Sequence, residues 1–155
     1  YHFCIGTECP HASFDSYADL LQERIVLAVN ARHPLAFREE VALSELYHEK
    51  FVLLNSRYSM HLIINQYLAQ SDQPIAVKAY CANAGFLRSA VREGWAVSFF
   101  PELSWKDDDL SGIRLIPLSD VSIYQTQRIF WNSKRYLPAV ALKFRDDLVS
   151  YFHKL

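Results

Sequence analysis

Short apolar runs, separated by polar and turn-rich stretches, mark the predicted strands of this chain. Residues 24–29, RIVLAV, are almost entirely aliphatic, which is typical of a strand buried on both faces in a parallel sheet. Pro34 excludes a strand in the loop that follows, at residues 30–37. Further strands are predicted at residues 2–5, 51–54, 75–79, 96–100, 113–116 and 124–131.

Between these strands the apolar residues follow helical spacing. Ser59 and Asn83 are candidate N-caps, because their side-chain oxygens can accept a hydrogen bond from an unpaired backbone amide. Gly94 is expected to end the second helix. The predicted segments are one turn at 44–47 capped by Ser44, and helices at 59–70, 83–92 and about 137–153. Strands that alternate with helices predict an α/β fold with a parallel sheet covered on both faces, and ligands bind at the strand edges of such folds.

Composition and charge narrow the class of protein. The chain has 155 residues, 51% hydrophobic and 21% charged, which suits one globular domain or two small lobes. The net charge is −1 and the basic residues are scattered. A nucleic-acid surface is expected to show a basic stripe, so we do not expect this chain to hold DNA by itself.

The cysteines and the first residues indicate a compartment. The chain has three cysteines, at positions 4, 9 and 81. A small, odd number of cysteines is not typical of a disulfide framework, and this favours a reducing cytoplasm. No apolar run reaches the roughly 18 residues that span a bilayer. The start lacks the basic and apolar regions of a signal peptide. A chain that begins without Met inside a predicted strand is expected to be a fragment.

Four ordered segments resemble the effector domain of LysR-type transcriptional regulators. The most specific is HPLA at residues 33–36, which follows the apolar strand and precedes a short L-x-E-L turn. Trp95 departs from the family pattern, in which a small residue is usual, and His2 stands where an acid is common. The segments are ERIVLAV at 23–29, HPLA with VALSEL at 41–46, LRSAVREGWAVSFFP at 87–101, and IFW at 129–131 with LPAV at 137–140 and Phe144.

The resemblance implies a two-lobed, periplasmic-binding-protein-like α/β fold. Residues 1–28 would be part of lobe one and a first crossover strand, 29–101 a complete lobe two, and 102–155 the return to a partial lobe one with the C-terminal helix. It also implies a cytoplasmic sensor that binds a small effector between two lobes and is not an enzyme. Its partners would be the effector and further copies in a homodimer or tetramer, with DNA bound only through a helix-turn-helix domain absent from this chain.

Helix N-termini meet strand ends at the edge of an α/β lobe, and their unpaired amides attract anions. This reasoning selects two segments for effector binding, namely Ser56, Arg57 and Ser59, and Ala82 with Asn83. Arg57 adds a planar fork that suits a carboxylate, so we expect a small anionic effector. Asn30 and Phe100, at the ends of predicted strands, complete the set. Each residue also has an alternative role without a ligand. Ser59 and Asn83 would be helix caps, Arg57 a solvated surface charge, Asn30 a turn residue and Phe100 a core aromatic side chain.

Other chemistry finds little support. Cys4, Cys9 and His11 supply three candidate ligands without a standard zinc spacing, and redox sensing by Cys9 or Cys81 is a minor alternative. With four glycines and no Gly-x-Ser-x-Gly, the chain lacks a phosphate loop and a nucleophile elbow. We therefore expect no metal or cofactor, and a solvated turn at residues 107–109. The rival classes are an extracytoplasmic solute-binding protein and a dehydratase-like enzyme of related lobed fold.

Overall fold

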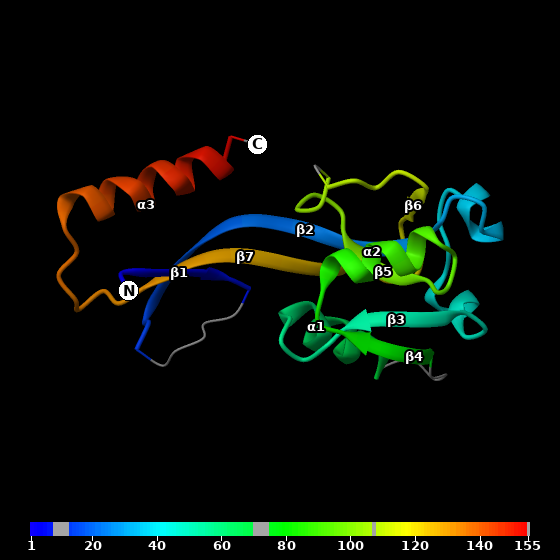
Figure 1. The fold of residues 1–155 in the computed structure, drawn as a ribbon. Helices are drawn as coiled ribbons and strands as arrows, with labels where there is room; N and C mark the ends of the chain where they lie inside the picture. The colour runs from blue at the N-terminus through cyan, green and yellow to red at the C-terminus, as the bar shows by residue number, and fades with distance from the viewer. Residues whose placement is uncertain (8–12, 70–74, 107, 155) are drawn as a thin grey trace. The chain divides into compact units, whose positions relative to one another are not determined.

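The computed structural model describes residues 1–7, 13–69, 75–106 and 108–154 (Figure 1). Within these ranges the elements follow the predicted order. They are β1 (Phe3–Gly6), β2 (Ser16–Asn30), the 3-10 turns η1 (Pro34–Phe37) and η2 (Leu43–Leu46), β3 (Lys50–Leu54), α1 (Ser59–Leu68), β4 (Ala76–Cys81), α2 (Ala84–Arg92), β5 (Ser98–Pro101), β6 (Ile113–Ile116), β7 (Ile123–Trp131) and α3 (Ala139–Phe152).

The chain divides into two compact units, each described separately. Unit 1 comprises residues 1–22 and 125–155, and unit 2 comprises residues 23–124. The boundaries between units therefore fall inside β2 and β7, whereas the segment ends predicted from the sequence, 28/29 and 101/102, fall inside unit 2. The reason is that the whole apolar run of β2 belongs to the core of unit 2, where Ile25 to Val29 are each at most 2% exposed.

Strand directions correct the expectation of one parallel sheet. In unit 2, β2 pairs antiparallel with β5, with Val26 opposite Phe100, and antiparallel with β6. β3 pairs parallel with β4, and Phe51 forms a parallel bridge with Val97 just before β5. Burial on both faces is thus confirmed for residues 25–29, whereas Arg24, at the start of the run, is exposed. The predicted direction of this strand is wrong because an apolar run records burial and carries no information about strand direction.

The core of unit 2 is built on β3 and the strands beside it. Phe51 and Phe99 are fully buried and their rings stack with centroids 5.1 Å apart. Helix α1 buries Met60 and Ile64, and α2 buries an apolar stripe of Leu87, Ala90 and Val91. Burial of such side chains contributes about 1.5–3 kcal/mol each, which holds both helices against this core and fixes their N-termini.

The helix starts agree with the sequence only in part. Asn83 caps α2, because its Oδ1 accepts from the Phe86 amide at 2.9 Å, as predicted. Ser59 is instead the first residue of α1, which follows Tyr58 and has no side-chain cap. Ser44 lies inside η2. Distant and neighbouring carboxylates hold that turn: Glu45 accepts from the Ala42 amide at 2.8 Å, and Asp120 accepts from the Leu43 amide at 2.8 Å.

The HPLA segment has a structural role in unit 2. His33 caps η1, since its Nδ1 accepts from the Leu35 amide at 3.2 Å. Its Nε2 lies 3.3 Å from a carboxylate oxygen of Glu49. Both ring nitrogens are therefore engaged, and they join the loop after β2 to the start of β3.

Unit 1 places β1 antiparallel to β7, with Ile5 opposite Ile129. Helix α3 contacts this pair through the Phe3 and Phe144 rings, 6.1 Å apart, and through Arg145, which lies 4.8 Å from the ring centre of Trp131.

Among the described helices, none combines the length and the hydrophobicity that crossing a bilayer requires.

A buried carboxylate fixes the turn that follows β5. Glu23 is 2% exposed and accepts from the backbone amides of Leu103 (2.9 Å) and Ser104 (2.7 Å), as well as from the Ser104 hydroxyl. Next to it, Arg24 forms a two-bond ion pair with Glu102 at 2.9 and 3.0 Å. The first two residues of unit 2 thus hold residues 102–104 in place.

We predict that Glu23→Ala lowers the free energy of unfolding by about 2 kcal/mol, because charge-assisted hydrogen bonds are lost and their donors keep no protein partner. Urea unfolding followed by circular dichroism measures the change. The exposed Glu39→Ala variant is the control and should remain within about 0.5 kcal/mol of the parent chain. Equal losses in both variants would contradict a role for the Glu23 carboxylate.

Candidate functional site

Two of the segments predicted to bind an effector meet at one end of unit 2. Residues 55–59 follow β3 and residues 81–83 follow β4, and the carboxyl ends of parallel strands share an edge. The Asn55 amide donates to the Cys81 carbonyl at 2.8 Å. The Tyr58 hydroxyl donates to the Ala82 carbonyl at 3.0 Å. We call residues 55–59 and 81–83 the carboxyl edge; it contains Ser56, Arg57, Ser59, Ala82 and Asn83.

A tight turn presents Arg57 at this edge. The Asn55 side chain accepts from the Arg57 amide at 3.1 Å, and the Asn55 carbonyl accepts from the Tyr58 amide at 3.0 Å. Ser56 and Arg57 are both exposed. Within the described part of the chain, the Arg57 guanidinium makes no hydrogen bond or ion pair. A planar cation with free donors therefore belongs to the turn that leads into α1, at the edge where α2 also begins.

The two helix N-termini differ in their free donors. Asn83 satisfies one amide of α2, whereas α1 begins without a side-chain cap. Unpaired amides in a first helical turn carry partial positive charge and favour an anion. The carboxyl edge thus combines backbone donors with the Arg57 cation, and all of these groups lie within unit 2.

A polar network behind the edge was not foreseen from the sequence. His61 Nδ1 lies 3.0 Å from the Leu54 carbonyl, which can only accept, so Nδ1 carries the proton and Nε2 accepts from the Asn65 amide nitrogen at 2.9 Å. The Tyr80 ring meets His61 edge-on at 5.1 Å. The four-residue spacing of His61 and Asn65 is the signal that could have revealed this pair. Tyr80, near the end of β4, and Phe86, in the first turn of α2, are each 50% exposed and add aromatic surface beside the edge.

Asn30 and Phe100 do not join the carboxyl edge. Because β2 runs antiparallel to β5, its last residues lie beside the first residues of β5, with Ala28 opposite Ser98. Asn30 therefore lines a pocket at the start of β3, together with Lys50 and Trp95. Phe100 is fully buried and its ring packs edge-on against Trp105 at 4.9 Å. In this structure Phe100 is a core side chain.

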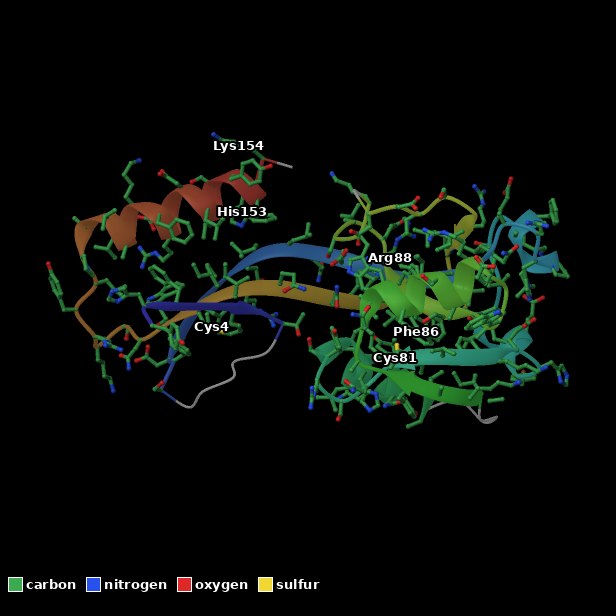
Figure 2. All side chains as sticks on the ribbon, viewed as in Figure 1. Cys4, Cys81, Phe86, Arg88, His153 and Lys154 are labelled. Atoms are coloured by element: carbon green, nitrogen blue, oxygen red, sulfur yellow. The ribbon has the colours of Figure 1, made fainter. Side chains whose placement is uncertain are left out.

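The cysteines offer no second type of centre among the described residues. The Cys81 thiol, at the end of β4, donates to the Asn83 carbonyl at 3.6 Å (Figure 2). Cys4 lies on β1 of unit 1. Cys9 and His11 lie outside the described residues. Across the described ranges, no three His, Cys, Asp or Glu side chains gather as a metal site would require.

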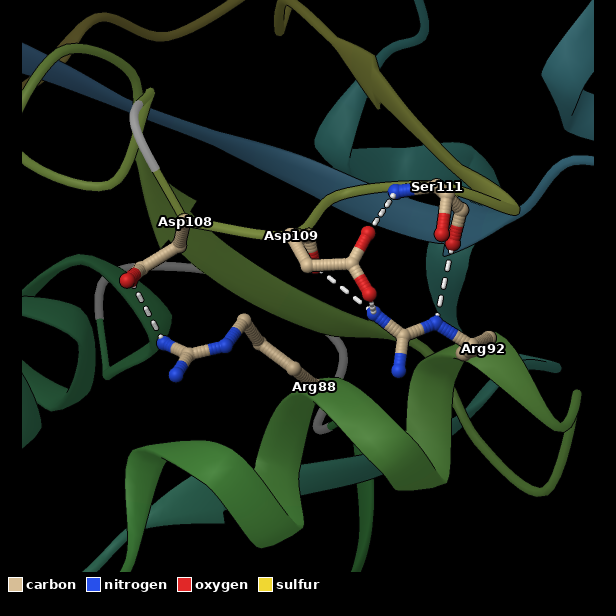
Figure 3. Close-up of polar contacts among 5 residues, drawn as sticks. All are labelled: Arg88, Arg92, Asp108, Asp109 and Ser111. Atoms are coloured by element: carbon tan, nitrogen blue, oxygen red, sulfur yellow. Dashed lines mark hydrogen bonds and ion pairs between the residues drawn. The ribbon is translucent and has the colours of Figure 1, made fainter.

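An arginine pair fixes α2 and so the position of Asn83 (Figure 3). Arg88 bonds Asp108 at 2.8 Å, and its guanidinium lies 5.2 Å from the ring centre of Trp105. Arg92 bonds the Asp109 carboxylate at 3.0 Å and the Ser111 carbonyl at 2.9 Å. The acidic turn predicted to be solvated is thus tied to α2 through Asp108 and Asp109. Hydrogen bonds from the Ser111 side chain and backbone, and to a smaller extent the Arg92 charge, lower the pKa of Asp109.

We predict a difference between two cap variants. Asn83→Ala should lower the free energy of unfolding by about 1 kcal/mol, because it removes an N-cap hydrogen bond. Ser59→Ala should change it by less than about 0.5 kcal/mol, since Ser59 caps nothing. Urea unfolding of both variants measures the two changes. A larger loss for Ser59→Ala than for Asn83→Ala would reverse the assignment of the caps.

We also predict an acid-dependent effect of Asp109→Asn. A carboxyl group with a depressed folded-state pKa stabilises the fold above its unfolded pKa, and this contribution is lost as the pH falls through the folded pKa. The variant should melt at a lower temperature than the parent at pH 6, and the gap should close as the pH falls below the ordinary pKa of 3.8. Melting curves from pH 6 to pH 3, with Glu40→Gln as the control, measure the gap. A gap that does not depend on pH would contradict this role.

Comparisons with known proteins identify the family of this chain. A family model described as the LysR substrate binding domain matches residues 2–152. The uncharacterised HTH-type transcriptional regulator YybE of Bacillus subtilis (strain 168) is 28% identical over 133 residues, which cover 86% of this chain and 45% of that protein. A probable RuBisCO transcriptional regulator of Cyanophora paradoxa is 23% identical over 154 residues, which cover 96% of this chain and 48% of that protein.

Two solved domains share the fold over 99% of this chain. The effector binding domain of QuiR, in complex with shikimate, has a TM-score of 0.85 at 14% identity, with 73% of that domain covered. The regulatory domain of CcmR from Synechocystis PCC6803, in complex with 2-PG, has a TM-score of 0.88 at 15% identity, with 74% covered. This chain spans about half the length of the curated relatives it matches. With the family model matched over residues 2–152, the chain belongs to the LysR substrate-binding domain family and has the fold of its effector domains.

Proposed function

We propose that this chain is the effector-sensing domain of a LysR-type transcriptional regulator, and that its carboxyl edge binds a small anionic metabolite. The observation that carries the proposal is the exposed Arg57 guanidinium. It has no partner among the described residues and belongs to the turn before α1, at the edge where α2 also starts. A carboxylate or phosphate placed there would gain a charge-assisted, two-bond contact and backbone donors as well.

Membership of the family supports a sensing role. Two neighbours in fold were solved with small molecules, shikimate for QuiR and 2-PG for CcmR. The curated relatives are transcriptional regulators, and one is named for its helix-turn-helix. In the proposed regulator, binding at this domain controls transcription through a DNA-binding domain, and copies of the regulator act together as a cytoplasmic oligomer. This chain acts as a binding module in that scheme and not as an enzyme.

The site residues divide by role in this proposal. Arg57 holds the charge of the ligand, and Ser56 and Ser59 offer hydroxyls beside it. Asn83 and the Ala82 backbone form the facing wall, supported by Tyr58. Asn30 and Phe100 are left out, because the structure places Asn30 at the other end of β3 and buries Phe100.

We predict that Arg57→Ala weakens binding of an anionic effector by about ten- to a hundred-fold, because a charge-assisted hydrogen bond contributes about 1.5–3 kcal/mol. Thermal stability should change little, because Arg57 is exposed. Calorimetric titration with a panel of carboxylates and phosphate esters, including shikimate and 2-PG, measures the affinity. Arg114→Ala, at an exposed arginine on β6, is the matched control.

Two outcomes would contradict the anion site. One is an effector that binds the Arg57→Ala variant as tightly as the parent chain. The other is a panel in which only neutral or cationic compounds bind. Either result would leave the family assignment intact, because that assignment rests on the match over residues 2–152.

A further inference from the structure

We propose that unit 2 has a second small-molecule site, which binds a planar organic anion such as an aromatic carboxylate. It is the pocket of about 290 Å³ lined by Asn30, His33, His48, Glu49, Lys50 and Trp95, with the backbone of residues 94–97. We call it the amino-edge pocket. Lys50 begins β3 and Leu54 ends it, so this pocket and the carboxyl edge lie at opposite ends of the same strand.

Backbone bonds join the two walls of the pocket. The Val97 amide donates to the Lys50 carbonyl at 2.9 Å, and the Val52 amide donates to the Val97 carbonyl at 3.1 Å. The wall with His48, Glu49 and Lys50 is therefore fixed to the wall with Trp95. A site formed by bonded backbone is organised before a ligand arrives, and less entropy is lost on binding.

The end of α2 positions Trp95. Gly94 adopts a φ of 73°, the left-handed conformation that glycine tolerates at a helix end, and its amide donates to the Val91 carbonyl at 3.0 Å. Asn30 supports this turn, since its Nδ2 donates to the Arg92 carbonyl and its Oδ1 accepts from the Arg32 amide at 2.8 Å. Its amide group is thus engaged with the backbone, so Asn30 forms part of the wall and does not hold the ligand.

The unpaired donors in the pocket favour an anion. Glu49 already faces His33 at 3.3 Å, and the other His33 nitrogen accepts from the Leu35 amide. By contrast, the Lys50 ammonium and the His48 imidazole make no hydrogen bond or ion pair with any described residue. The pocket therefore offers a free ammonium and a second free donor. Its carboxylate, Glu49, keeps its charge, because the His33 ring that contacts it accepts at Nδ1 and is neutral, but it is held on the side of His33. A cationic ligand would have to compete with His33 for Glu49 and would meet the repulsion of Lys50.

The shape and the aromatic wall favour a flat, single-ring ligand. Trp95 is 67% exposed, which leaves an indole surface beside the pocket available for stacking. The volume of about 290 Å³ lies just below the range of roughly 300–1,000 Å³ for small-molecule sites, which suits a small ligand. A ligand with one aromatic ring can stack that ring on Trp95 and direct its carboxylate toward Lys50 and His48. It then contacts the free groups of both walls.

Three nearly isosteric probes separate charge from shape. Nicotinate is anionic, nicotinamide is neutral and 1-methylnicotinamide is cationic. Each is titrated into the full ¹⁵N-labelled chain while the indole N–H signals of Trp95, Trp105 and Trp131 are followed by NMR; Trp95→Phe assigns the Trp95 signal. We expect nicotinate to shift the Trp95 signal saturably, with Trp105 and Trp131 little affected. Lys50→Met should weaken nicotinate about tenfold or more, through loss of a charge-assisted bond.

The controls distinguish this site from the carboxyl edge. Lys78→Met removes an exposed lysine on β4 and should leave the nicotinate titration of the Trp95 signal unchanged. Unshifted Trp105 and Trp131 signals in the Lys50→Met variant show that it is folded. The second site is overturned if nicotinate does not shift the Trp95 signal up to its solubility limit, or if nicotinamide or 1-methylnicotinamide binds as tightly. It is also overturned if Arg57→Ala abolishes the response, which would place the binding at the carboxyl edge.

Discussion

Burial of β2 residues Ile25 to Val29 between antiparallel partners is the constraint on which the arrangement of unit 2 depends. Because β5 runs against β2 and in the direction of β3, the part of β2 at residues 23–25, with which unit 2 begins, lies beside the end of β5. There Glu23 and Arg24 hold residues 102–104. The exit of β2 lies at the starts of β5 and β3, where Asn30 meets Gly94 and Lys50. One strand direction thus decides which loops share an edge and which are a strand length apart.

Sequence reasoning succeeded where the determinant is local. The apolar residues 25–29 predict burial because each of them carries the signal. Asn83 predicts a cap because its partner is three residues away. It failed where the partner is distant. Ser44 was the expected cap of the turn at 44–47. The Leu43 amide instead donates to the carboxylate of Asp120, which lies 77 residues away in the sequence. The position of Asn30 could not be predicted, since it follows from strand direction, which hydrophobic patterning does not record.

The resemblance to a family located the fold without explaining its motifs. HPLA is the most specific segment in the sequence, yet its histidine caps a 3-10 turn and contacts Glu49. Its specificity therefore reflects local structure, and a search for site residues based on the motif would have selected a structural group. The acidic turn with Asp108 and Asp109 shows the opposite error, because there the sequence suggested no structural role. Its aspartates resemble solvated charges in the sequence, and in the structure they fix α2, and with it the Asn83 cap, through Arg88 and Arg92.

An unpaired cation is weak evidence for a site by itself, because an exposed arginine or lysine is usually solvated. Arg114 and Lys78 are cations of this kind on β6 and β4. Arg57 and Lys50 differ from them in their surroundings. Arg57 stands beside two helix starts that leave backbone donors free, and Lys50 lines a pocket whose carboxylate already faces His33 and whose other wall carries an exposed indole. In both places the neighbouring groups add donors or apolar surface, and no carboxylate among the described residues forms an ion pair with the cation. An anion is the ligand that satisfies all of these groups together, and for that reason the charges at the two ends of β3 are proposed as sites while Arg114 and Lys78 serve as controls.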